Sequence, residues 1–75
     1  MSKQVEVAER HLLACAEAYA LGYSVHMRML LGSHKGTVSA EEFKRSETVF
    51  WETKARLEAA KTALISALDE EMDGA

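Results

Sequence analysis

The stretch LLACAEAYALGYSVHMRMLL, residues 12–31, decides the fold because its seam residues recur at alternating spacings of three and four. This spacing is typical of a helix whose seam faces a partner helix. With the residues before it, the stretch supplies two rows: Val5, Leu12, Tyr19 and His26, then Ala8, Cys15, Gly22 and Met29. A later segment repeats the spacing in the rows Phe43, Phe50, Leu57 and Leu64, then Ser46, Thr53, Ala60 and Ala67. Two helices folded back on each other would share one core.

The two seams fit each other in size when residues are paired so that their numbers add to 72. Most pairs then place a large side chain against a small one, as close packing requires. We call them the sum-72 ladder: Val5–Ala67, Ala8–Leu64, Leu12–Ala60, Cys15–Leu57, Tyr19–Thr53, Gly22–Phe50 and His26–Ser46. The ladder predicts an all-α chain that forms an antiparallel two-helix hairpin.

Local signals bound the first helix and the turn. Ser2 can cap a helix over about residues 3–31, and Gly32 can adopt the left-handed conformation that ends it. A polar, glycine-bounded turn over 32–38 then returns the chain antiparallel.

The second helix opens with a capping box. The Ser39 hydroxyl can accept from the Glu42 amide while the Glu42 side chain reaches back, so we expect a helix over about 39–70. Four acidic residues between positions 69 and 73 place negative charge at the negative end of this helix. We therefore expect the acidic C-terminus, residues 71–75, to fray. One hairpin domain accounts for residues 1–75.

Composition narrows the class of protein. The chain has 75 residues, 48% of them hydrophobic and 28% charged, and no proline. Its net charge of −3 disfavours nucleic acid and anionic membranes as partners. Glu17 and Arg28 lie within the most apolar stretch, so we expect no membrane-spanning helix. One cysteine and no apparent secretory signal suit the cytoplasm.

The first helix has more apolar surface than one partner helix can cover. Beside its seam lies a second apolar stripe: Leu13, Ala16, Ala20, Tyr23, Met27 and Leu30. Further apolar positions widen the surface: Ala14, Ala18, Leu21 and Val25. A helix that is apolar around most of its circumference is normally buried. We predict that the stripe, with Trp51, forms a dimer or partner interface. A twofold dimer of hairpins would be an antiparallel four-helix bundle, while a heteromer or higher oligomer would satisfy the same pattern.

Two residue pairs invite a chemical interpretation. His11 and Cys15 lie four apart, as an imidazole-activated thiolate or half of a metal site would. His26 and Ser46 match a base and a nucleophile. A structural metal site needs about four ligands, and a nucleophile needs oxyanion donors and a group to orient its base. We therefore interpret both pairs as packing layers and predict no enzyme, no metal and no cofactor.

Basic residues gather near the expected turn: Arg28, His34, Lys35, Lys44 and Arg45. Farther along the second helix, cations alternate with glutamates as on a solvated face. The favoured hypothesis is a binding protein that acts by contact with an unidentified protein, as an adaptor, regulator or inhibitor. Small proteins of this type are also carried by phages and other mobile elements.

In its hairpin and its large-and-small core layers, the chain resembles the Rop family of plasmid copy-number regulators, which are dimers of helical hairpins. Rop-type proteins bind paired RNA loops through one helix face. The resemblance implies the alternative function, a dimeric regulator that binds RNA or DNA.

Overall fold

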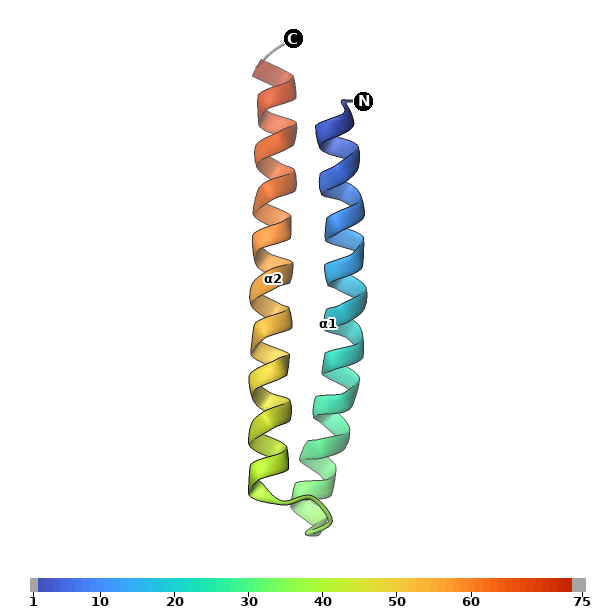
Figure 1. Ribbon diagram of the computed structural model, residues 1–75, viewed down its shortest axis with the longest axis vertical. Coiled ribbons are helices and arrows are strands. Elements are labelled where there is room, and N and C mark those ends of the chain that lie inside the picture. Colours follow the sequence, from blue (N-terminus) through green and yellow to red (C-terminus); the bar gives the residue numbers. More distant parts are fainter. Residues whose placement is uncertain (1, 74–75) are drawn as a thin grey trace.

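The computed structural model describes residues 2–73 as two long helices, α1 (Lys3–Lys35) and α2 (Ala40–Asp73). They lie side by side and antiparallel, so both chain ends are at one end of a rod and the turn is at the other (Figure 1). Of the residues described, 93% are helical and none is in a strand. The predicted all-α hairpin is confirmed.

The seam lies where the sequence places it, since every residue of the four seam rows is buried or half-buried. The most buried apolar side chains are Val5, Cys15, Ala60 and Ala67. Near the turn, His26 Nδ1 lies 3.5 Å from Ser46 Oγ, a pair of the sum-72 ladder. Near the chain ends, Gln4 Nε2 donates to Glu70 Oε2 at 3.2 Å. The numbers of this pair differ from the ladder's sum by two. The predicted register therefore holds to within two residues near both ends of the hairpin.

One pair of the ladder is wrong, because Gly22 faces Thr53 and not Phe50. A Cβ atom on Gly22 would lie 3.3 Å from Thr53 Oγ1 and would have no Phe50 atom within 4 Å. A long side chain on a helix is directed toward the helix N-terminus. The Phe50 ring accordingly lies beyond Gly22 and stacks on His26, with 4.9 Å between the ring centroids.

α1 ends four residues later than predicted, at Lys35. Gly36, rather than Gly32, has the left-handed conformation, with φ of 81°, and its amide donates to carbonyls of the last turn. The predicted turn over 32–38 is therefore shortened to residues 36–39.

Gly32 is buried inside α1 for a different reason, the close approach of the turn. Its carbonyl accepts from the Thr37 amide at 2.8 Å and the Val38 amide at 3.2 Å. A Cβ atom on Gly32 would overlap Val38 Cγ2. The absence of a side chain, and not backbone freedom, is what this position requires.

The predicted Ser39 cap of the second helix is confirmed, whereas the Glu42 carboxylate bonds the Ser39 hydroxyl in place of the Ser39 amide of a full capping box. The Glu42 amide donates to Ser39 Oγ at 3.2 Å, and the Ser39 hydroxyl donates to Glu42 Oε1 at 3.2 Å. The Glu42 carboxylate thus reaches back to the hydroxyl of the cap.

The C-terminal end of α2 is helical through Asp73, so the expected fraying is not seen at residues 71–73; residues 74 and 75 lie outside the described part. The Ser2 amide donates to Glu71 Oε1 at 3.1 Å, and the Ser2 hydroxyl donates to Glu71 Oε2 at 3.2 Å. Ser2 also caps α1 as predicted, since its Oγ accepts from the Val5 amide. The antiparallel arrangement sets acidic residues of α2 beside the positive end of α1, where negative charge is stabilising.

The hairpin is a rod that exposes more surface than a compact chain of its mass. It measures 58 × 13 × 12 Å, and its radius of gyration is 16.9 Å, against roughly 11 Å for a compact domain of this length. Its accessible surface of 5726 Å² is about 1,100 Å² larger than the roughly 4,600 Å² expected for a compact 8.3 kDa monomer. Neither helix, within the part described, carries a stretch apolar enough to cross a bilayer.

We predict that Gly32→Ala destabilises the hairpin. The helix propensity of alanine would add about 1 kcal/mol of stability, but overlap with Val38 should cost about 2–3 kcal/mol, for a net loss of about 1–2 kcal/mol. Urea unfolding of Gly32→Ala, Val38→Ala and the double variant measures the coupling. Val38→Ala should partly relieve the loss, and a Gly32→Ala chain more stable than the parent would contradict the packing argument.

We predict that Glu71→Ala lowers the free energy of unfolding by about 0.5–1 kcal/mol, because it removes the acceptor for Ser2 and a charge at the N-terminal end of α1. Asp69→Ala is the control: it removes the same charge about half a turn away, and Asp69 makes no hydrogen bond or ion pair to α1 in the described structure. Thermal unfolding should show the control unchanged or slightly stabilised, and equal losses in both variants would rule out the cross-helix contact.

Candidate interaction surfaces

The seam divides the remaining apolar surface of the hairpin into two flanks. The aromatic flank is the predicted interface: Leu13, Ala16, Ala20, Tyr23, Met27, Leu30 and Trp51. The groove flank, on the other side of the seam, comprises Ala14, Ala18, Leu21, Val25 and Val49. Helical spacing places the two sets on opposite sides of the seam rows. Each flank is therefore a separate surface that can meet a partner.

The aromatic flank is organised around the ring of Phe50. Its centroid lies 5.5 Å from that of Tyr19, 5.9 Å from that of Tyr23 and 5.5 Å from that of Trp51. Lys54 Nζ lies 4.9 Å above the Trp51 ring, a cation–π contact. These contacts join the two helices and build a ridge beside the seam.

Most of the predicted interface lies on the surface of the hairpin. Leu13, Tyr23, Leu30 and Trp51 are exposed, Trp51 by 55%, and Ala20 is exposed too. The two remaining members, Ala16 and Met27, are half-buried against the seam. The structure therefore leaves this flank free to meet another molecule.

The groove flank contains a hollow of about 530 Å³ between the helices. It is lined by Ala18, Leu21, Gly22, Val25, Met29, Glu42, Arg45, Ser46, Val49 and Thr53. A second hollow of about 210 Å³, lined by His11, Ala14, Cys15, Ala18, Thr53 and Arg56, shares Ala18 and Thr53 with the first and extends it. Sequence reasoning found these apolar residues but missed the groove. The available signal was the small residues of α1 on that side.

His26 and Ser46 form a packing layer. The His26 ring stacks on Phe43 and Phe50, at centroid distances of 5.4 and 4.9 Å. The Ser46 hydroxyl donates its hydrogen to the Phe43 carbonyl at 2.8 Å, so the contact with His26 requires the imidazole to donate. A serine held in this way is not activated by the imidazole as a nucleophile.

His11 and Cys15 do meet, with Nε2 and Sγ separated by 3.7 Å. Cys15 is buried in the seam, while His11 is exposed at the edge of the second hollow. Within residues 2–73, no group of three or more His, Cys, Asp and Glu side chains is arranged to hold a metal ion.

The five basic residues near the turn, Arg28, His34, Lys35, Lys44 and Arg45, are all exposed. The structure brings Lys44 and Arg45 together around a shallow hollow, which they share with Glu41 and Thr48. His34 and Lys35 lie in the last turn of α1, whereas Arg28 lies about 10 Å before Lys35 along the helix axis. Glu41 thus lies among the cations of the predicted basic patch.

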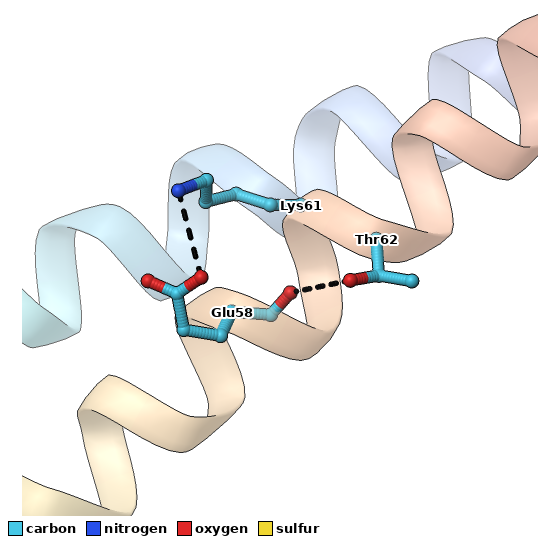
Figure 2. Close-up of polar contacts among 3 residues, drawn as sticks. All are labelled: Glu58, Lys61 and Thr62. Carbon is cyan, nitrogen blue, oxygen red and sulfur yellow. Dashed lines mark hydrogen bonds and ion pairs between the residues drawn. The ribbon is translucent and has the colours of Figure 1, made fainter.

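The outer face of α2 has the mixed charge expected of a solvated surface. The Glu58 carboxylate lies 3.5 Å from Lys61 Nζ, and the Thr62 hydroxyl donates to the Glu58 carbonyl at 3.1 Å; both contacts are drawn in Figure 2. Both charged side chains are more than half exposed, so the ion pair adds little stability.

Comparison with protein-family models found no match to the chain, and comparisons with curated proteins and with solved structures also found none.

We predict that Phe50→Ala destabilises the hairpin more than Phe43→Ala does. Phe50 contacts rings on both helices, so its loss should cost near the lower end of the roughly 3–5 kcal/mol typical of Phe→Ala. Phe43 is the matched control, because among the described aromatic and imidazole rings it contacts His26 alone. Urea unfolding of both variants gives the comparison, and an equal or larger loss for Phe43→Ala would contradict the central role of Phe50.

Proposed function

We propose that the protein is a homodimeric four-helix bundle that acts by contact with another protein, as an adaptor, regulator or inhibitor. One observation carries the proposal. Within the described residues, Val5 is the one large apolar side chain that is fully buried, whereas twelve large apolar side chains are exposed. A hairpin with so small a core gains stability by covering these side chains with a second protein surface.

The excess surface supports self-association. The hairpin exposes about 1,100 Å² more than a compact monomer would, and a standard protein interface covers about 800 Å² on each partner. A second copy is present wherever the first is, and a twofold axis lets one apolar surface serve both chains. Two hairpins with their α1 helices central form an antiparallel four-helix bundle.

Contact with a further protein is supported by the composition of the aromatic flank. Tryptophan and tyrosine are enriched among the residues that contribute most to binding energy, and Trp51 and Tyr23 are both exposed here. The Trp51 ring is held by Phe50 on one side and Lys54 on another, so little side-chain freedom is lost when a partner covers it. A rigid helical surface of this kind recognises a protein through shape and apolar contact.

We predict that the purified chain sediments as a dimer at micromolar concentration and, when immobilised, retains one protein from extracts of its source cell at 0.5 M salt. Apolar contacts persist at high salt, whereas contacts with nucleic-acid phosphates weaken steeply. A monomer would contradict the bundle. Retention of RNA or DNA that salt releases, in place of a protein, would instead support the Rop-like alternative.

A further inference from the structure

We infer that the groove flank seats α1 of a second copy of this chain, running antiparallel to the first, and that the aromatic flank stays free for the protein partner. This inference rests on the proposed function, and it names the surface through which the two copies meet.

The shapes of the two flanks differ in the way this assignment requires. The groove flank has an unfilled hollow of about 530 Å³ between the helices, with Leu21 and Val25 on its α1 side. The aromatic flank has its rings already packed against one another into a ridge. Helices pack by inserting the ridge of side chains on one into the groove of another. The two hollows described between the helices both lie on the groove flank.

The α1 residues of the groove flank complement their own copy in size. Leu21 and Val25 follow Ala14 and Ala18 along the helix, with the alternating three and four spacing of a second seam. When two copies of α1 run antiparallel with paired numbers adding to 39, Leu21 lies opposite Ala18 and Val25 opposite Ala14. Large side chains therefore face small ones, as they do in the seam within the hairpin. The next pair outward, His11 with Arg28, is polar and lies at both ends of this contact, where solvent can reach it.

The deciding experiment compares Leu21→Glu with Leu13→Glu. The two leucines lie on opposite flanks of α1 and are exposed to a similar degree in the hairpin, 69% and 63%, so neither change should unfold it. Sedimentation equilibrium should show the dimer dissociation constant raised at least about 100-fold by Leu21→Glu, since a carboxylate would be buried without a partner. For Leu13→Glu it should change less than about threefold. Circular dichroism checks that both variants stay helical.

Cross-linking provides a second measurement that does not depend on the strength of the dimer. In a Cys15→Ala background, an Ala18→Cys chain mixed with a Leu21→Cys chain should form a disulfide-linked dimer under mild oxidation, while two Leu13→Cys chains should not. Dissociation by Leu13→Glu alone, or preferential linkage at position 13, would overturn the inference and leave the dimer intact. A parent chain that is monomeric throughout would instead overturn the proposed function.

Discussion

Two helices in contact can cover only one face of each other, and this geometric limit governs the whole molecule. The seam uses the matched rows of both helices, and every residue in them is buried or half-buried. Even so, the rod is 58 Å long and about 12 Å thick, so none of residues 2–73 lies far from solvent. Small buried residues such as Ala60 and Ala67 bring the helices close but contribute little apolar area. The stability of the fold is therefore linked to whatever covers the remaining surface.

Features that depend on one helix or on the pairing of two rows were predictable from the sequence. The caps at Ser2 and Ser39, the seam and its register all follow from local hydrogen bonding and periodicity. The errors arose where parts distant in sequence meet. A glycine such as Gly32 commonly ends a helix. In the structure the turn instead folds back onto Gly32, and Val38 occupies the space that a side chain on Gly32 would need. Fraying of the acidic end of α2 was predicted from the dipole of α2 alone. The structure places Glu71 beside the first turn of α1, which the sequence pattern of α2 does not report.

The candidate surfaces also divide into features that one helix determines and features that depend on both helices. Apolar residues beside the seam are visible in the sequence, so the aromatic flank was predictable, Trp51 included. The groove depends on the space between two helices, and periodicity along one helix does not report that space. The pairing of Gly22 with Phe50 failed for a related reason, because a long ring reaches away from the level of its own backbone. The sequence shows which seam positions carry small residues. The direction of the side chains on the facing helix decides which of them packs against each small residue.

We expect a second copy of the chain to add stability to the folded hairpin, and the thermal midpoint as a function of chain concentration measures that gain. Association that is linked to folding makes the midpoint depend on concentration. We expect a midpoint that rises steadily when the concentration of the parent chain is raised about 100-fold. A midpoint that stays constant over that range, with full helicity below it, would show that association adds no stability to the hairpin and would contradict the proposed dimer.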